Sequence, residues 1–496
     1  MLTNNDKKPH VVIIMADQLR ADIITPDFAP NIYSLSQESF RFNRAYCASP
    51  LCVPARGSFF TGQYPNETGC LINPWEKQDA AYGFVREGIP NLYQLLEDDW
   101  DSWHTGKQHL LTQERFDLSE DSRTNWLPLE GRYDRHLKEQ GKRKPGGAPF
   151  QGIVPEMAGG TTTRVAGYSI PTTGCYDEGF DAFFDGFILN DSLRALRERD
   201  RNKPLFLSSM FLAPHPPLEI PEPWYSMYAQ ADISLPENVG LWAANQSPLQ
   251  LYNLTGAIGT RYSRDEWHQV WKVYAGLVRL LDDCVGRIIE ELKIQGIYDN
   301  TILIFTSDHG EMLGSHRLWQ KMCMYEESVR TPLFIKFPVS FQPAINETNT
   351  LVSAIDIMPT LCDGLGIPVP ESVAGLSLMP IVQGKCLERQ RIFIQFDGNG
   401  ARGNFQRCVI EGNYKLIVDI FKDELYLELY NTATDPQELI NLAFEKGYQE
   451  IIHTLLGHLK NYMLDTGDLL AIPGDAYTTF INKYSPFHIS LSEVQF

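Results

Sequence analysis

HVVIIMADQ, residues 10–18, is an unbroken apolar stretch that ends in an acid and an amide. A run this short and continuous is typical of a strand that is buried on both faces of a sheet. Similar runs follow in PNLYQLLEDD (90–99), PLFLSSMFLAP (204–214) and TILIFTSDHG (301–310). They alternate with helical patterns, of which residues 267–295 form the clearest. This alternation predicts the α/β class, with a large, mainly parallel sheet flanked by helices.

Two other regions have a different character. Residues 115–175 are charged and glycine-rich, which predicts long loops. Beyond residue 388, short strand-like pieces precede an amphipathic helix near 446–464, and they predict a smaller α+β subdomain with an antiparallel sheet. We therefore expect domains at 1–387 and 388–496. The strand-like pieces are RIFIQF (391–396), QRCVIEG (406–412), YKLIVDI (414–420) and LYLELYN (425–431).

Composition excludes several classes of function. The net charge of −19 repels polyanions and argues against nucleic-acid binding. No segment reaches the roughly 18 unbroken apolar positions of a membrane span, so we expect no membrane association. The apolar run at 11–15 is too short for a signal-peptide core, which predicts a cytoplasmic protein as written, or a periplasmic or secreted one if a signal has been removed. Nine cysteines without C-x-x-C spacing argue against a disulfide framework or structural zinc site.

Two predicted strands end in polar groups. Asp17 and Gln18 follow the first strand, and Asp308 and His309 follow the strand at 301–307. Because the carboxyl ends of parallel strands meet at one edge of a sheet, we expect these side chains to lie together. Either acid alone would be interpreted as a helix cap, but the pair favours a metal site. Two carboxylates, an amide oxygen and an imidazole suit one divalent cation, Ca²⁺ first, with Mn²⁺ or Mg²⁺ as alternatives.

The stretch CASPLCVPARGSFFTGQYP, residues 47–65, places Cys47 and Cys52 five positions apart. Either they form a redox or metal-binding pair, or one cysteine is prepared for chemistry beside Arg56. The segment CVPAR (52–56) resembles the C-x-P-x-R signature of the type I sulfatases, a family of the alkaline phosphatase superfamily. The resemblance covers most of the chain and implies an alkaline phosphatase-like sheet. It assigns no role to Cys47, which we expect to be a packed core thiol.

In that family the motif cysteine is oxidised to formylglycine, so the resemblance implies a formylglycine at Cys52 and a formylglycine-generating enzyme as a partner. One hydroxyl of the hydrated aldehyde, which also binds the metal, attacks sulfur and expels the alcohol; the second then loses its proton and releases sulfate. The resemblance implies that Arg56 holds this nucleophile and balances developing charge. Residues 1–387 would then be a sulfatase catalytic domain that hydrolyses a sulfate monoester, with a sulfated carbohydrate as the first expected substrate.

Three further segments match the sulfate pocket of the family. Lys107 and His109 resemble the pair of the G-K-x-H-L segment, which contacts the sulfate and the formylglycine. His215 follows an apolar strand, as the histidine of the family's P-H-x-P segment does, and is a candidate for protonating the leaving oxygen. Lys321 matches a lysine that clamps a substrate oxygen. Together they would give an acidic protein the local positive charge needed around a small-molecule or oligosaccharide sulfate ester.

Two positions depart from the commonest sulfatase pattern. Gln18 stands where a second aspartate is usual, and His309 stands where asparagine is frequent. This pair resembles the phosphonate monoester hydrolases, which makes phosphonate monoester or phosphodiester hydrolysis the alternative and shifts the metal preference toward Mn²⁺. Lys107 and His109 favour the sulfatase, because the phosphonate enzymes tend to lack them. A two-zinc phosphodiesterase would need Ser or Thr at position 52, and a noncatalytic binding module would be expected to lose motif positions that are all filled here.

Selectivity for the alcohol part is expected from variable loops around His104, from residues 120–175 and from the C-terminal subdomain. Trp103, Trp126 and Tyr168 are candidates for stacking on a sugar or aryl ring.

Overall fold

The predicted large sheet is present in the computed structural model, which describes residues 8–158, 160–164, 167–387 and 389–489. Its eight strands lie in the order β16-β2-β15-β13-β1-β11-β4-β5. Strands β13, β1, β11, β4 and β5 run parallel, whereas β15 is antiparallel to both of its neighbours. The strands are β1 (His10–Asp17), β2 (Phe40–Phe42), β4 (Asp101–Gly106), β5 (Asn125–Pro128), β11 (Leu205–Pro214), β13 (Thr301–Ser307), β15 (Leu333–Lys336) and β16 (Glu347–Thr348).

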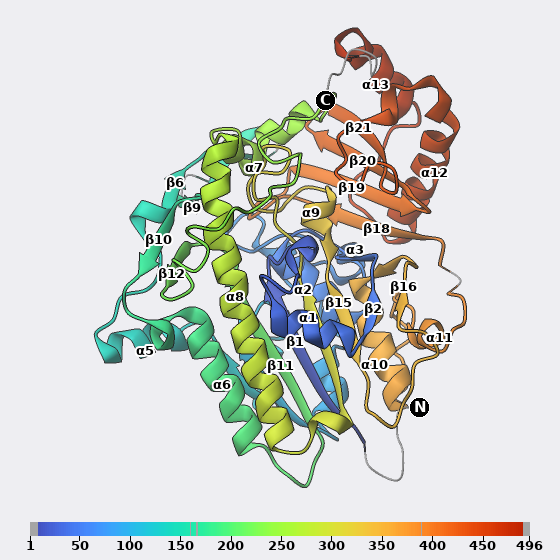
Figure 1. Ribbon diagram of the computed structural model, residues 1–496. Helices are drawn as coiled ribbons and strands as arrows, with labels where there is room; N and C mark the ends of the chain where they lie inside the picture. Colours follow the sequence, from blue (N-terminus) through green and yellow to red (C-terminus); the bar gives the residue numbers. More distant parts are fainter. Residues whose placement is uncertain (1–7, 159, 165–166, 388, 490–496) are drawn as a thin grey trace.

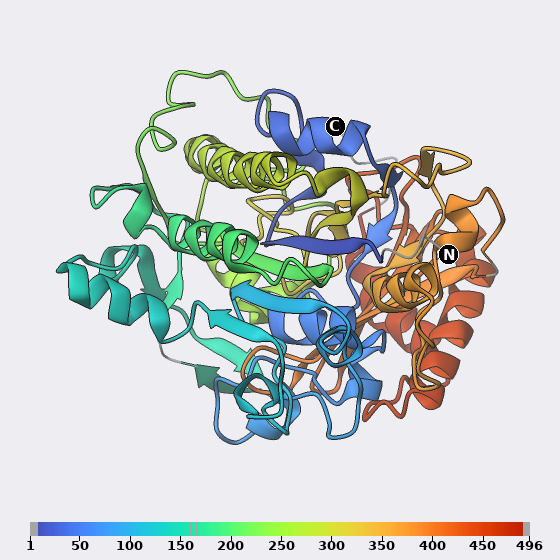
Figure 2. The ribbon, with the colours of Figure 1, turned by 90° about the horizontal axis from the view of Figure 1, so that it is seen from below.

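Strand β1 lies between β13 and β11 and is buried on both faces, as its apolar run predicts. Its alternate side chains belong to two cores. Val12 and Ile14 pack with α1, α6 and α8, whereas Val11 and Ile13 pack with α2, α4, α10 and α11. Figures 1 and 2 show these helices as layers on opposite faces of the sheet. The helices are α1 (Pro30–Gln37), α2 (Cys52–Thr61), α4 (Leu92–Leu96), α6 (Phe184–Glu198), α8 (Arg264–Ile294), α10 (Ile357–Leu365) and α11 (Met379–Val382).

A second sheet occupies the upper right of Figure 1. Its four strands are antiparallel and follow chain order, and α12 packs against β19 and β20. These elements confirm the predicted antiparallel sheet and the helix that follows it. The predicted boundary at 387/388 stays a prediction, and residue 388 lies outside the described residues. The elements are β18 (Arg391–Phe396), β19 (Asn404–Glu411), β20 (Tyr414–Phe421), β21 (Glu424–Asn431), α12 (Gln449–Asp465) and α13 (Ala476–Tyr484).

One predicted strand is wrong. Within PNLYQLLEDD, residues 92–96 form helix α4, because the Asn91 side chain accepts hydrogen bonds from the backbone N–H groups of Tyr93 and Gln94. The Gln94 side chain accepts one from the backbone N–H of Asn91, which completes a capping box. The strand beside β11 is instead β4, whose short sequence DSWHTG contains no continuous apolar run.

The region 115–175 is also more regular than the loops predicted for it. It contains α5 and a series of short strands, which pair locally with one another or with nearby segments. The remaining helices and strands are β3 (Ala45–Tyr46), β6 (Gln151–Ile153), β7 (Glu156–Ala158), β8 (Thr161–Arg164), β9 (Gly167–Ser169), β10 (Thr173–Tyr176), β12 (Leu218–Pro221), β14 (Arg330–Thr331), β17 (Val352–Ser353), α3 (Pro65–Thr68), α5 (Arg132–Gln140), α7 (Leu254–Gly259) and α9 (Glu326–Val329).

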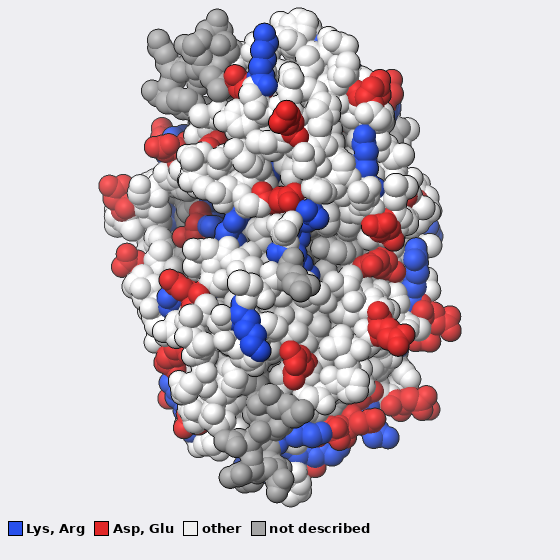
Figure 3. Space-filling model, turned by 90° about the vertical axis from the view of Figure 1, so that its right-hand side faces the viewer, with Lys and Arg blue, Asp and Glu red and all other residues white. Residues whose placement is uncertain are grey.

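Charged side chains are dispersed on one face of the molecule. Figure 3 shows the side of the molecule that lies on the right of Figure 1, where acidic and basic side chains are interspersed. Among the helices of the described ranges, none has the length and apolar character needed to cross a membrane.

Candidate active site

Four neighbouring parallel strands direct polar residues to one place at their carboxyl ends. Strand β1 ends in Asp17, Asp308 follows β13, His215 follows β11, and Lys107 follows β4. The register aligns β1 with β13 on one side and with β11 on the other, and β11 with β4. Residues that are hundreds of positions apart in the sequence therefore become neighbours, as expected where ligand groups gather in an open α/β sheet.

Helix α2 brings Cys52 to these strand ends. Cys52 is the first residue of the helix and is buried. Its Sγ lies 3.1 Å from His309 Nε2 and 3.7 Å from Asp17 Oδ1. Cys47 is buried in the main core with apolar neighbours, so the two cysteines of residues 47–65 have separate environments.

Asp17, Cys52, Asp308 and His309 form a cluster of candidate metal ligands. Each offers one ligand atom, these atoms all lie within 4.8 Å of one another, and all four residues are buried. Two carboxylates beside an imidazole are a suitable donor set for a divalent cation of hard to intermediate character. The residues present therefore fit a metal site, and they are four of the five ligands predicted from the sequence.

Gln18, the fifth predicted ligand, has its side chain oriented by two hydrogen bonds. Its Nε2 donates to Glu311 Oε2, and its Oε1 accepts from Lys321 Nζ at 2.6 Å. The backbone of Gln18 is left-handed, with φ of 69°, a conformation that costs a non-glycine residue energy and often occurs at functional sites. Glu311 was not identified from the sequence. It also accepts a 2.6 Å hydrogen bond from the backbone N–H of Gln320 and thereby links Gln18 to the turn that carries Lys321.

Arg56 lies one helical turn after Cys52 and bridges the two carboxylates. Its Nε donates to Asp308 Oδ2 and its Nη2 to Asp17 Oδ2, each at 3.0 Å. Its Nη1 donates to the carbonyl oxygen of Lys107 at 2.9 Å. Lys107 Nζ pairs with the same Asp17 oxygen and lies 3.7 Å from Cys52 Sγ. The planar guanidinium, with its donors in a fixed fork, thus holds both acids in one orientation.

The surrounding charges stabilise a negative group at position 52. Burial and the Asp17 carboxylate raise the pKa of the Cys52 thiol, but the nearby charges of Lys107, Lys321 and His309 outweigh them and lower it. Burial also raises the pKa of Asp17, yet Lys107 and the other neighbouring basic groups hold it well below its usual range. The site therefore carries the positive potential that an anionic substrate requires.

The surroundings of the two candidate catalytic histidines favour the neutral imidazole. Burial lowers the pKa of both His109 and His215 well below the usual value, and the Lys107 ammonium lowers it further. His215 Nε2 lies 3.2 Å from Lys321 Nζ. His109 Nε2 lies 3.8 Å from Glu130 Oε1, and its buried Nδ1 has no hydrogen-bond partner among the described residues.

A cavity of about 280 Å³ opens over this cluster. Five of the residues predicted to be catalytic line it. The sixth, Arg56, does not line it, and neither do the candidate metal ligands Asp17, Gln18, Asp308 and His309. The five are Cys52, Lys107, His109, His215 and Lys321.

Sequence reasoning missed a polar chain along one wall of this cavity. Asn73 Oδ1 accepts from the backbone N–H of Val53 at 3.2 Å, and Asn73 Nδ2 donates to Asn399 Oδ1 at 3.2 Å. Asn399 Nδ2 then donates to the Tyr168 hydroxyl at 2.9 Å. Asn399, in the β18–β19 connection, connects the C-terminal sheet to the helix that carries Cys52. No sequence signal distinguishes these asparagines from ordinary loop residues.

The three aromatic candidates have different positions. Tyr168 lines the cavity beside Cys52. Trp103 is buried in the main core, and Trp126 packs among Tyr93, His104 and other aromatic rings. Both tryptophans are therefore packing residues and do not line the cavity.

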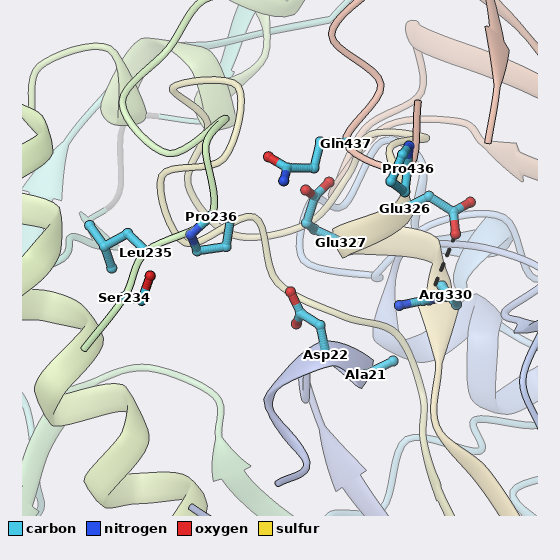
Figure 4. A pocket seen from close by; sticks show the side chains of 10 residues that line it. All are labelled: Ala21, Asp22, Ser234, Leu235, Pro236, Glu326, Glu327, Arg330, Pro436 and Gln437. Carbon is cyan, nitrogen blue, oxygen red and sulfur yellow. Dashed lines mark ion pairs between the residues drawn. The ribbon is translucent and has the colours of Figure 1, made fainter. Parts of the chain in front are cut away.

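Another cavity, of about 410 Å³, contains none of the predicted catalytic or metal-binding residues (Figure 4). Asp22, Glu326, Glu327 and Arg330 line it, and Glu326 pairs with Arg330 at 3.7 Å. Glu326 also pairs with the buried Lys415 at 2.9 Å. The first pair is local, and the second joins the catalytic region to strand β20 of the C-terminal sheet, so these contacts are structural ion pairs.

Comparisons with known proteins agree with this geometry. The sulfatase family model matches residues 9–367, and the model for the C-terminal part of N-sulphoglucosamine sulphohydrolase matches residues 314–465. A choline-sulfatase of Rhizobium meliloti (strain 1021) is 29% identical over 451 residues, which cover 88% of this chain and 82% of that protein.

Two solved structures share the fold. The phosphonate monoester hydrolase of Agrobacterium radiobacter has a TM-score of 0.72 at 23% identity, covering 93% of this chain and 95% of that one. A 2-O GAG sulfatase has a TM-score of 0.70 at 20% identity, covering 93% of each chain. Because the sulfatase model spans well over half of the sequence and includes the strand ends and helix α2, the chain belongs to the sulfatase family of enzymes, in the alkaline phosphatase superfamily.

Proposed function

We propose that the protein hydrolyses a sulfate monoester to an alcohol and sulfate, after a formylglycine-generating enzyme has converted Cys52 to formylglycine. The observation that carries this proposal is the position of Cys52. Its Sγ lies between His309 Nε2, at 3.1 Å, and Lys107 Nζ, at 3.7 Å, and it faces a cavity lined by two lysines and two histidines. A group at this position meets both a candidate metal cluster and the positive charge that a sulfate needs.

We assign Asp17, Gln18, Asp308, His309 and residue 52 to one divalent cation. Ca²⁺ is our first assignment, with Mn²⁺ or Mg²⁺ as alternatives, and the imidazole of His309 favours Mn²⁺ among these two. When present, the cation and the hydrated aldehyde at residue 52 supply a nucleophilic hydroxyl of lowered pKa.

The other residues orient the sulfate and manage the proton. Lys107 and Lys321 hold sulfate oxygens by charge-assisted hydrogen bonds. Arg56 keeps Asp17 and Asp308 in position through its two 3.0 Å contacts. His215 protonates the leaving alcohol oxygen, and Lys321 Nζ, 3.2 Å from His215 Nε2, supplies that proton to the imidazole. His109, which also lines the cavity, contacts the sulfate.

We propose a sulfated carbohydrate as the substrate. Besides the lysines and histidines, the cavity is lined by neutral polar and aromatic groups, among them Asn399, Tyr168, Gln151 and Trp75. Amide and phenol groups suit sugar hydroxyls, and aromatic rings suit the apolar faces of pyranoses. The 2-O GAG sulfatase that shares this fold is one example of a carbohydrate-directed enzyme.

Hydrolysis of a phosphonate monoester or phosphodiester is the second candidate. His309 in the metal cluster and Gln18 beside it favour this candidate, and the fold is shared with a phosphonate monoester hydrolase. Lys107 and His109, which both line the cavity, favour the sulfate ester.

The deciding experiment compares kcat/KM for 4-nitrophenyl sulfate and for a phenylphosphonate ester. It uses protein produced with a formylglycine-generating enzyme and shown by mass spectrometry to carry the modification at residue 52. We expect the sulfate to be the better substrate. A higher value for the phosphonate would replace our first proposal with the second.

A further inference from the structure

A second cavity adjoins the active-site cavity, and we infer that it is a binding subsite for a further sugar unit of a sulfated saccharide. This inference rests on the proposed sulfatase function. The second cavity measures about 370 Å³, and two residues, Gln151 and Ser169, line both cavities. Its other lining residues are Lys144, Pro145, Gly146, Gly147, Phe150, Phe184 and Pro217.

The two shared residues form the partition between the cavities. Gln151 of β6 and Ser169 of β9 are register partners in a short antiparallel pair. The Gln151 side chain is exposed and lies across Gly167, where an added Cβ would come within 2.7 Å of Gln151 Oε1. The part of the partition that Gln151 contributes is therefore a flexible, solvent-exposed side chain, which is able to move aside or bind a bridging sugar hydroxyl.

The floor of the second cavity is aromatic and firmly held. Phe150 and Phe184 are buried and contribute to the lining. An added Cβ at Gly174 would come within 2.7 Å of Phe150, and one at Gly146 within 2.9 Å of Pro217. Phe150 therefore packs against the backbone of Gly174, and Phe184 contacts the rings of Tyr133 and Phe183, so this aromatic surface is preformed. Preformed aromatic rings beside polar groups suit the apolar face and the hydroxyls of a sugar ring.

Lys144 supplies a positive charge to this cavity. Its Nζ pairs with Asp134 at 3.0 Å, and the two side chains are 54% and 63% exposed. A pair this exposed contributes at most about 1 kcal/mol, so an acidic ligand group can replace the aspartate at little cost. The second sugar unit is therefore expected to carry a carboxylate or a second sulfate.

Cavity size supports the same conclusion. The active-site cavity of about 280 Å³ lies just below the range of roughly 300–1,000 Å³ for typical ligand pockets. It suffices for a sulfate and a single ring. A longer saccharide would need more space, and the adjoining cavity of about 370 Å³ provides it beyond Gln151.

The test uses formylglycine-containing enzyme and a panel of monosaccharide sulfates, each paired with a disaccharide sulfate that adds a uronic acid or a neutral sugar. For each pair that is hydrolysed, kcat/KM is measured for the wild type, Lys144→Glu and Gln151→Trp. Lys138→Glu is the matched control, because Lys138 is an exposed residue of α5 that lines neither cavity.

We expect the wild type to prefer the uronic-acid disaccharide over its monosaccharide by at least 10-fold. Lys144→Glu should reduce this ratio at least 5-fold while Lys138→Glu preserves it, and Gln151→Trp should reduce the ratio for both kinds of disaccharide.

Equal use of mono- and disaccharides by the wild type would overturn the inference, as would a ratio that Lys144→Glu leaves unchanged. Hydrolysis of 4-nitrophenyl sulfate without hydrolysis of any saccharide sulfate would also overturn it and leave the proposed sulfatase function standing. Failure of fully modified enzyme on every sulfate ester would overturn both.

Discussion

Replacing Arg56 by lysine tests whether a planar guanidinium is needed to orient the metal-binding carboxylates. The substitution keeps the positive charge but replaces a rigid fork of donors by a single ammonium. In the native site, Nε and Nη2 reach Asp308 and Asp17 simultaneously at 3.0 Å, and Nη1 reaches the Lys107 carbonyl at 2.9 Å. We expect a lysine at this position to lose at least one of the two contacts with carboxylates.

The magnitude follows from the bonds lost. A hydrogen bond between charged groups contributes about 1.5–3 kcal/mol, and loss of one lowers kcat/KM or metal affinity by about 10- to 100-fold. The assay combines kcat/KM for 4-nitrophenyl sulfate with calorimetric titration of the metal-free protein with Ca²⁺ and Mn²⁺. Circular dichroism checks that the variant is folded.

The matched control is Arg132→Lys. Arg132 also makes a forked contact, with Nη1 and Nη2 on the two oxygens of Asp191, but it lies on α5 and does not line the active-site cavity. We expect kcat/KM of this control to stay within about 2-fold of the wild type, since substitutions away from a site have small effects. Wild-type activity and metal affinity in Arg56→Lys would refute the proposed orienting role.

Three further variants test the chemistry and one aspect of stability. Cys52→Ala should abolish sulfate-ester hydrolysis in a folded protein; turnover above that of a mock purification would contradict the assignment of the nucleophile. Asp308→Ala should lose bound metal and activity together, and full metal occupancy by elemental analysis would show that the ligand assignment is wrong. The Tm of Asp419→Asn minus the Tm of the wild type should increase as pH rises from about 4 to 8. Burial raises the pKa of Asp419 to about 8 in the folded wild type, whereas the unfolded chain releases this proton near pH 4. The free energy of unfolding of the wild type therefore falls as pH rises from about 4 to 8. A Tm difference that does not change with pH would contradict this reasoning.

The long apolar elements were predicted well from the sequence. Strands β1, β11 and β13 have continuous apolar runs because they are buried on both faces, and α8 shows helical spacing throughout its length. Strand β4 was missed because it is short and carries polar residues. The helix α4 was mistaken for a strand, because its signal is the capping exchange between Asn91 and Gln94, not a hydrophobic period.

The residues of the site also divide into those with a local sequence signal and those without one. The structure brings together acids and cations that the sequence places beside strand ends or within a motif, namely Asp17, Asp308, Lys107 and the C-x-P-x-R pair. Glu311 lies two residues after His309, close to a predicted site residue. Its place in the site depends on contacts with Gln18 and with the turn that carries Lys321, which the sequence does not reveal. Asn399 had no signal, because it contributes to the site only through hydrogen bonds to residues of other segments.

The sequence alone determined the fold class, the family and the chemical types gathered at the site. Those properties follow from local patterns in the sequence, namely continuous apolar runs, polar residues at strand ends and the spacing of a motif within one helix. The tertiary structure decided which loops form the walls beside Cys52, how the amide of Gln18 is turned, and that a second cavity shares Gln151 and Ser169 with the first. Such features depend on the packing of segments that are far apart along the chain, and no local pattern encodes those distances.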